Sequence, residues 1–336
     1  MNLGFHESEC SAPLPGLYMP VTARHAATAK LFAAVVATIV FLACAAPMRA
    51  SADQVRIAQW LDLREGRIEL AVRFDRGEEA WAHYVAERCA QYLPAVERYL
   101  DMPLHRAAKI YFGERAQPWT IEIVGAREVM QGGVRVGAYN NLGGYYPGER
   151  AVFVEYGLAP RGNPATVLHE LSHLWIYVTA ATRPPAGAPW FVEGAASALP
   201  LALAEAGRLP LGEAEVAALR AHWGIGWTPA REIDLPVIED LRLRGGSFVG
   251  VYYSKTFKLQ LILRRELGAP GYAGLLRRAA GRMPLESDRA VFALLDEMKR
   301  GDWRSLLSGW LTAGTYRHIS PDAFMRARGA APMDFE

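Results

Sequence analysis

The sequence predicts an α+β fold in which a small mixed sheet, accompanied by one helix, is followed by a helical lobe. Two patterns predict it. Short apolar or alternating stretches typical of strands occur between residue 53 and about residue 157, and from Pro164 onward apolar residues recur three and four positions apart, as on helices. We expect the sheet lobe to occupy residues 53–160 and the helical lobe to occupy residues 161–336. With 51% hydrophobic residues, a chain of this length can bury a sizeable core.

The amino-terminal segment, residues 1–52, is expected to be a signal peptide rather than part of the fold. Two basic residues precede an apolar run at 31–46, and residues 50–52 (Ala-Ser-Ala) offer the small side chains that a signal peptidase recognises. The run is shorter than the roughly 20 residues that span a bilayer. These features predict cleavage after Ala52 and a periplasmic or secreted protein without a stable membrane span. An uncleaved signal that anchors the chain to the membrane is the alternative.

The charge balance argues against a nucleic-acid partner. The predicted leader carries three basic residues (Arg24, Lys30, Arg49) and two acidic ones (Glu7, Glu9), so its removal lowers the formal net charge from +2 to +1. A chain so close to neutrality lacks the electrostatic footprint that binding to nucleic acid requires.

In the sheet lobe we expect one amphipathic helix at 80–100 and a loop or hairpin over the glycine-rich segment 131–150. Cleavage of the leader leaves Cys89 as the single cysteine, so no intramolecular disulfide is expected, and its spacing on the helix predicts a core residue. The strands predicted by alternating or apolar runs are 67–74, 109–112, 120–124 and 151–156.

In the helical lobe, apolar residues at helical spacing are separated by Gly and Pro. A first helix is expected within 164–179. The helices predicted after it include 211–223, 249–267, 272–282, 287–300 and 303–312.

The first of these helices carries the pattern H-E-x-x-H, formed by His169, Glu170 and His173. Histidines four apart lie on one face of a helix, about one turn of ~5.4 Å along the axis, so both imidazoles can reach one small cation. Alone, the pattern fits a solvated helix with two polar histidines equally well. The apolar residues around it place the helix in the core, where an imidazole needs a partner, and a metal ion is one.

A third metal ligand is available at Glu193, which follows Pro189 at the start of another predicted helix. Small residues after Glu193 would let this helix approach the first one closely. The alternative is an ordinary first-turn carboxylate that the helix dipole stabilises. Together with the two histidines, Glu193 favours an open zinc site, in which three protein ligands leave one position for water.

The two segments LHELSHLW (168–175) and PWFVEGAA (189–196) together resemble the gluzincin branch of the zincin metallopeptidases. Aminopeptidases of the leukotriene hydrolase type and bacterial peptidase MA-like domains are similar. The resemblance implies a zincin-like catalytic domain that acts on peptides or proteins, with Zn²⁺ held by His169, His173 and Glu193 and with Glu170 as general base. It extends over about 151–312 and is specific only in the two quoted segments.

A further likeness concerns Tyr253, which is similar to a tyrosine that these aminopeptidases use to stabilise the oxyanion. A phenol donates a hydrogen bond while it stays neutral near pH 7. A core aromatic residue is the alternative for Tyr253. Tyr252 is the second candidate for the role, and His222 is a further possible donor.

Two departures from the family pattern stand out. No G-x-M-E-N segment, which captures a substrate amino terminus in the aminopeptidases, precedes the zinc helix, and Glu155 occupies that region instead. Exopeptidase activity is therefore not implied. The thermolysin-like branch carries an aspartate four positions after its glutamate ligand, where this chain has Ser197. We also expect strand 151–156 to be the sheet edge that pairs with extended substrate.

Two other functions fit the same sequence. One is a non-catalytic binding module of the cell envelope that keeps the zincin fold, and the other is a zinc hydrolase of non-peptide amides or esters. The substrate, the cleavage preference and the oligomeric state are not indicated by the sequence.

Overall fold

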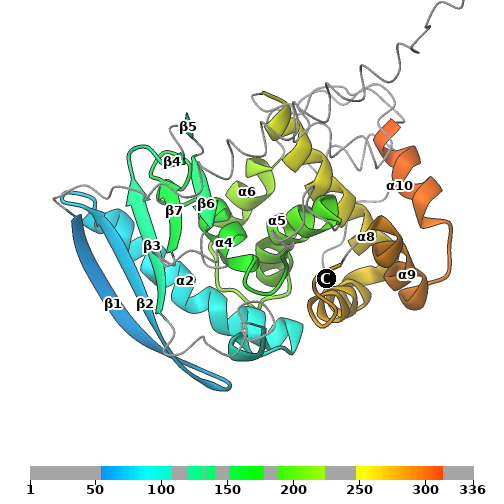
Figure 1. Ribbon diagram of the computed structural model, residues 1–336, viewed down its shortest axis with the longest axis horizontal. Helices are drawn as coiled ribbons and strands as arrows, with labels where there is room; N and C mark the ends of the chain where they lie inside the picture. The colour runs from blue at the N-terminus through cyan, green and yellow to red at the C-terminus, as the bar shows by residue number, and fades with distance from the viewer. Residues whose placement is uncertain are drawn as a thin grey trace, which may run out of the picture. The chain divides into compact units, whose positions relative to one another are not determined.

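A mixed five-stranded sheet and a set of helices make up the described part of the chain, as the computed structural model in Figure 1 shows. The structure describes residues 54–107, 120–131, 134–135, 137–140, 151–177, 188–223, 247–285 and 287–312. The predicted signal peptide and the predicted strand 109–112 lie outside these residues.

The sheet has the order β1-β2-β3-β7-β6. Strands β2, β3 and β7 are parallel to one another, and β1 and β6 run antiparallel to their neighbours at the two ends. A separate two-stranded hairpin, β4-β5, lies between β3 and β6 in the sequence. The bounds are β1 Gln54–Leu63, β2 Gly66–Asp75, β3 Thr120–Ala126, β4 Met130–Gln131, β5 Val134–Arg135, β6 Ala138–Asn140 and β7 Ala151–Glu155.

The expectation that 151–156 forms an edge strand is wrong. β7 pairs with β3 on one side and with β6 on the other, and all five of its residues are buried. A strand covered in this way shows a continuous apolar run, which identifies an interior strand but not its neighbours. Its partner β6 is only three residues long and lies in the glycine-rich segment that suggested a loop or hairpin. Among the described strands, β6 therefore forms this border of the sheet.

Strand β1 is absent from the sequence prediction. Its inward positions Val55, Ile57, Leu61 and Leu63 alternate and pack against the core, but Gln59 interrupts them. Trp60 points to the opposite side and is 54% exposed, beneath the guanidinium of Arg67. An edge strand of this kind has a weaker period-two pattern than the fully paired β2 beside it.

The helices follow the predicted ranges closely, with one exception. Their bounds are α2 Glu79–Leu100, α4 Ala165–Ser172, α5 Pro189–Glu205, α6 Glu213–His222, α8 Ser247–Ala280, α9 Asp288–Met298 and α10 Trp303–Thr312. Helix α8 contains a break at Gly268, whose φ of 70° no helix allows, so the two predicted helices 249–267 and 272–282 are its two halves.

The exception is the helix expected over 164–179, because α4 ends at Ser172. The N–H of His173 bonds to the carbonyls of Glu170 and Leu171, and tight turns continue to Ile176. The apolar residues at 174–177 are buried as expected, but they belong to these turns. Apolar spacing does not distinguish a helix from a short buried turn at its end.

One continuous core runs from the sheet to the last helices. Helix α2 contacts β2 on one side and α4, α5 and α8 on the other, so it lies between the sheet and the helical lobe (Figure 1). Cys89 of α2 is fully buried in this core, as predicted, and burial raises the pKa of its thiol.

The proposed boundary at 160/161 falls in the connection between β7 and α4. Within the described ranges, no helix combines the length and the apolar character needed to cross a membrane.

Helices α5 and α8 approach each other very closely at Gly194. A Cβ atom at this position would lie 2.5 Å from the carbonyl oxygen of Thr256. The side-chain amide of Gln260 donates to the carbonyl of Phe191 at 3.3 Å and accepts from the hydroxyl of Tyr272 at 3.1 Å. The main chain next to Glu193 is thus held against the helix that carries Tyr253.

Candidate metal centre

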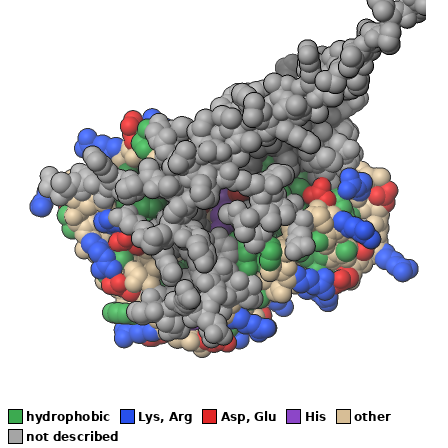
Figure 2. All heavy atoms as spheres, in the orientation of Figure 1, with side chains coloured by type: hydrophobic (Ala, Val, Ile, Leu, Met, Phe, Trp, Pro, Cys, Tyr) green, Lys and Arg blue, Asp and Glu red, His purple; other side chains and the backbone are tan. Residues whose placement is uncertain are grey.

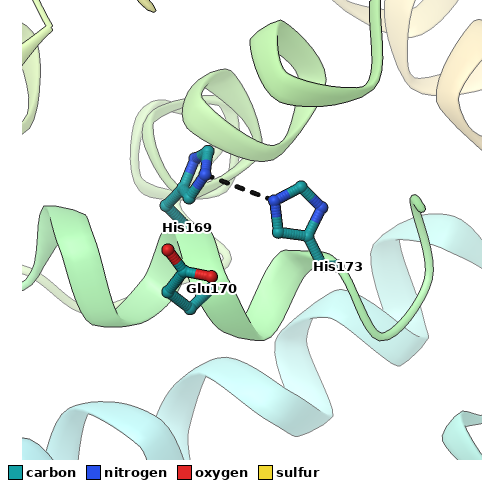
Figure 3. Close-up of side chains that lie close together, drawn as sticks. All are labelled: His169, Glu170 and His173. Carbon is teal, nitrogen blue, oxygen red and sulfur yellow. Dashed lines mark hydrogen bonds between the residues drawn. The ribbon is translucent and has the colours of Figure 1, made fainter. Parts of the chain in front are cut away.

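Three of the side chains singled out in the sequence meet where α4 faces α5. His169 lies in the last turn of α4, His173 caps its end, and Glu193 lies early in α5. Nε2 of His169 is 3.3 Å from Nε2 of His173 (Figure 3). Oε2 of Glu193 is 3.3 Å from the first nitrogen and 3.5 Å from the second. The three atoms form a nearly equilateral triangle.

The main chain determines which nitrogen of His173 faces this triangle. Nδ1 of His173 lies 2.8 Å from the carbonyl oxygen of Ile176. A carbonyl only accepts hydrogen bonds, so Nδ1 carries the proton and Nε2 is turned toward the other two groups. The carbonyl of Ile176 is within reach because the chain leaves the α-helix after Ser172. The helix end that the sequence pattern missed therefore orients one imidazole.

These three atoms require a proton or a cation between them. Without one, the negative carboxylate oxygen and the lone pairs of the two imidazole nitrogens would repel one another at this spacing. Burial disfavours a charged imidazole at His173, but the carboxylate of Glu193, together with the charge of Glu170 and the hydrogen bond to Ile176, raises the pKa of His173 to about 9. Burial also opposes ionisation of Glu193, yet the charge of His173 and the close contact of both imidazoles with the carboxylate hold the pKa of Glu193 well below its usual value. A metal cation would compete with a proton for the same position.

The triangle fits a zinc ion. Zinc–nitrogen and zinc–oxygen bonds of about 2.0 to 2.2 Å in a tetrahedron place ligand atoms about 3.3 to 3.5 Å apart. The observed separations of 3.3, 3.3 and 3.5 Å match this spacing. His169 and Glu193 are buried, whereas the side chain of His173 keeps 16% of its surface exposed. On the face seen in Figure 2, one histidine side chain is visible near the centre.

Glu170 lies next to His169 on α4, beside the two histidines (Figure 3). One ligand atom each from His169, Glu170 and His173 lie within 4.8 Å of one another, a looser group than the one that includes Glu193. Burial raises the pKa of Glu170, the charges of His169 and His173 lower it, and the charge of Glu193 adds to the rise, so that the net shift is upward. A carboxylate with a raised pKa takes up a proton more readily, as a general base must.

Two aromatic rings pack near His169. The ring of Tyr253 lies 5.7 Å from that of His169, and the ring of Trp223 lies 5.0 Å from it. Tyr252 is fully buried in the main core, whereas Tyr253 is half-buried. Trp223 was not singled out in the sequence, although its position at the end of a predicted helix, next to His222, offered a weak signal.

His222 lies near the centre, but both of its ring nitrogens are engaged. Nδ1 is 3.2 Å from the side-chain amide of Asn163, and Nε2 is 3.2 Å from the hydroxyl of Thr166. The amide oxygen of Asn163 accepts from the N–H of Ala165, so its NH₂ group faces and donates to Nδ1. His222 thus donates from Nε2 to Thr166. Burial, and secondarily the charge of His169, lower the pKa of His222 to about 4.

Glu155 has a structural partner. Its carboxylate accepts two hydrogen bonds from Arg135, at 2.7 and 2.6 Å, and one from the N–H of Val129 at 3.1 Å. These bonds attach the β4-β5 hairpin to the end of β7. The hydrogen bond from Arg135 is the main cause that lowers the pKa of Glu155.

No family model and no curated protein matches this sequence. Solved structures match in fold. An M1 zinc metallopeptidase from Deinococcus radiodurans is 15% identical, with a TM-score of 0.51 over 79% of this chain and 54% of that protein. The fold is zincin-like. Aminopeptidase A from Legionella pneumophila, in complex with aspartic acid, is 11% identical, with a TM-score of 0.47 over 78% of this chain and 28% of that protein. The chain spans about half the length of the Deinococcus metallopeptidase.

Proposed function

We propose that this protein is a zinc-dependent peptidase of the gluzincin type that hydrolyses peptide bonds. The observation that carries the proposal is the triangle formed by Nε2 of His169, Nε2 of His173 and Oε2 of Glu193, with Glu170 beside it. These three side chains would hold Zn²⁺, which when bound supplies a Lewis acid for the scissile carbonyl and activates a water. The shared fold with an M1 zinc metallopeptidase supports this assignment.

Glu170 is proposed as the proton carrier. Its carboxylate takes a proton from the attacking water, whose oxygen adds to the carbonyl carbon of the peptide. When the carbon–nitrogen bond breaks, the same carboxylate passes the proton to the leaving amine. The raised pKa of Glu170 suits both transfers.

Tyr253 is proposed to donate a hydrogen bond to the oxyanion that forms on the carbonyl oxygen. It packs edge-on against the ring of His169 from α8, and it is half-buried. A neutral phenol provides this donor without adding charge to the ground state. The burial of Tyr252 in the core supports Tyr253 over its neighbour.

Strand β6 is proposed to bind the substrate backbone. It contacts α4 and has β7 on one side only among the described strands. An extended peptide that pairs with a sheet edge gains main-chain hydrogen bonds independent of its side chains. This role, expected for 151–156 from the sequence, is therefore assigned to residues 138–140.

Export completes the proposal. Residues 1–52 are proposed to be a cleaved signal peptide, and the periplasm or the extracellular medium is the proposed place of action. The mature chain would consist of a sheet lobe (53–160) and a helical lobe (161–336), with a peptide or protein as partner.

The proposal is tested by Glu170→Gln, which keeps the size of the side chain but cannot take up a proton near neutral pH. We expect zinc content, folding and peptide binding to be retained, while cleavage of unfolded casein and of a mixed peptide library falls by several orders of magnitude. Glu87→Gln is the matched control, because Glu87 is an exposed carboxylate on α2 with 57% of its side chain accessible.

The other outcomes contradict the proposal. Cleavage that persists undiminished in Glu170→Gln would rule out Glu170 as general base. Zinc binding without cleavage by the wild type would favour a binding module. Hydrolysis confined to small amides or esters in a substrate panel would favour the non-peptide hydrolase.

A further inference from the structure

Ser197 lies between the two helices that form the centre, and its side chain is in contact with both of them. The residue belongs to α5 and is 1% exposed. Its hydroxyl oxygen is 3.0 Å from Nδ1 of His169 and 2.8 Å from the main-chain carbonyl oxygen of Glu193. One buried hydroxyl therefore joins an imidazole from α4 to the backbone of the carboxylate residue on α5.

The positions of the protons follow from these two contacts. A serine hydroxyl has one proton, and the carbonyl of Glu193 can only accept, so the hydroxyl donates to that carbonyl. Nδ1 of His169 must then donate to the serine oxygen. The imidazole is consequently protonated at Nδ1, and its Nε2 faces His173 and Glu193.

We propose that Ser197 is a positioning residue for the metal centre, which fixes the tautomer and the ring orientation of His169 and couples this ring to Glu193 before a cation binds. The inference rests on the zinc site proposed above. Groups that hydrogen-bond the second nitrogen of a ligating histidine contribute about 10- to 100-fold to metal affinity. The support that Ile176 provides to His173 comes from the main chain, so Ser197 is the side chain through which this contribution can be measured.

Ser172 offers a matched control on α4, where its hydroxyl faces Tyr92 of α2. It is also fully buried, its hydroxyl donates to the carbonyl of Leu168 at 2.7 Å, and it lies 2.5 Å from the hydroxyl of Tyr92. Within the described residues, its hydroxyl hydrogen-bonds neither imidazole nor Glu193. Ser197→Ala and Ser172→Ala each remove one buried hydroxyl, so both are expected to lower thermal stability, but only the first removes support from His169.

The experiment measures the zinc dissociation constants of the folded variants by competition with a chromophoric chelator. We expect Ser197→Ala to bind zinc about 10- to 100-fold more weakly than the wild type. Ser172→Ala should bind zinc about as tightly as the wild type does, and Glu193→Ala should show the loss caused by removing a ligand. Ser197→Thr retains a hydroxyl and should recover most of the affinity.

A second measurement reports the hydrogen bond itself. In zinc-loaded protein with ¹⁵N-labelled histidine, the Nδ1 proton of His169 should exchange slowly in the wild type and in Ser197→Thr, and rapidly in Ser197→Ala. Equal zinc affinity of Ser197→Ala and the wild type would overturn the role of Ser197 and leave the assignment of Glu170 untouched. Absence of zinc binding by the wild type would instead remove the centre on which both proposals depend.

Discussion

Adjacent tyrosines on α8 have different surroundings because consecutive side chains on a helix are turned by about 100°. Tyr252 is fully buried in the core, and Tyr253 packs against His169 and Trp223. Spacing in the sequence left both as candidates for the oxyanion donor. Their burial distinguishes the two candidates. A donor must reach the substrate, which favours the half-buried Tyr253 over the fully buried Tyr252.

Tyr253→Phe is expected to lower turnover by about 10²- to 10³-fold, the usual effect of losing one oxyanion donor. The ring and its packing against His169 remain, so zinc content and thermal stability should stay near those of the wild type. Steady-state kinetics on a peptide substrate measure the effect. Tyr252→Phe serves as the comparison, and impaired turnover in that variant with an unchanged rate in Tyr253→Phe would move the role by one residue.

The motif residues could be predicted from the sequence because they are close together along the chain or belong to two short segments. His169 and His173 are one helical turn apart, and Glu193 follows a helix-starting proline. Trp223 could not be predicted in this way, since its contact with His169 depends on how α6 packs against α4. Ser197 was noted only as a departure from a family pattern, because a side-chain hydrogen bond between two helices leaves no local signal.

At the level of elements, strands that are paired on both sides and long helices matched their predicted ranges, whereas elements at borders did not. β1 and β6 lie at the two ends of the sheet, and α4 ends in a turn. Propensity and periodicity are weakest at such positions, where side chains are half-exposed or the backbone changes direction. The segment 131–150, expected to be a loop or hairpin, begins with the β4-β5 hairpin and also contains β6, the strand that borders β7.

Gly194→Ala is predicted to disturb the spacing of α5 and α8. The added methyl group would lie 2.5 Å from the carbonyl oxygen of Thr256, so the helices must move apart. We expect a loss of about 1 to 3 kcal/mol in the free energy of unfolding, typical of overpacking. Turnover should fall more than zinc affinity, because the shift separates Tyr253 from Glu193 but leaves α4 in place.

Chemical denaturation, zinc titration and peptide hydrolysis measure the three effects of Gly194→Ala. Gly157→Ala is the control, since a Cβ atom there would meet nothing within 4 Å. If Gly194→Ala matched the wild type in stability and turnover, the close approach of α5 and α8 would contribute to neither.

For the whole molecule, the fold class was confirmed because it depends on the sum of many weak patterns rather than on any one of them. The order of the strands was not predictable, since pairing across the sheet joins residues far apart in the chain. The continuous core contains Cys89, a free cysteine among the described residues, as its helical spacing predicted.

Export makes a direct prediction about the mature chain. Because the Ala-Ser-Ala sequence at 50–52 follows an apolar run, amino-terminal sequencing of protein from the extracytoplasmic fraction should begin at or near Asp53. Replacing Ala50 and Ala52 by bulky residues should prevent this cleavage. Full-length protein found only in the cytoplasm would contradict export.

The short length of α4 has a consequence for how this centre can vary among related sequences. One histidine is supported by a backbone carbonyl of the turn at Ile176, which every residue type provides, and the other by the hydroxyl of Ser197, which few do. A point mutation at position 197 can therefore change the metal affinity through His169, whereas no single substitution removes the carbonyl that supports His173. Changes on the other side require an insertion or deletion that reshapes the turn after His173. We expect related chains to differ at position 197 and to share the length of this turn.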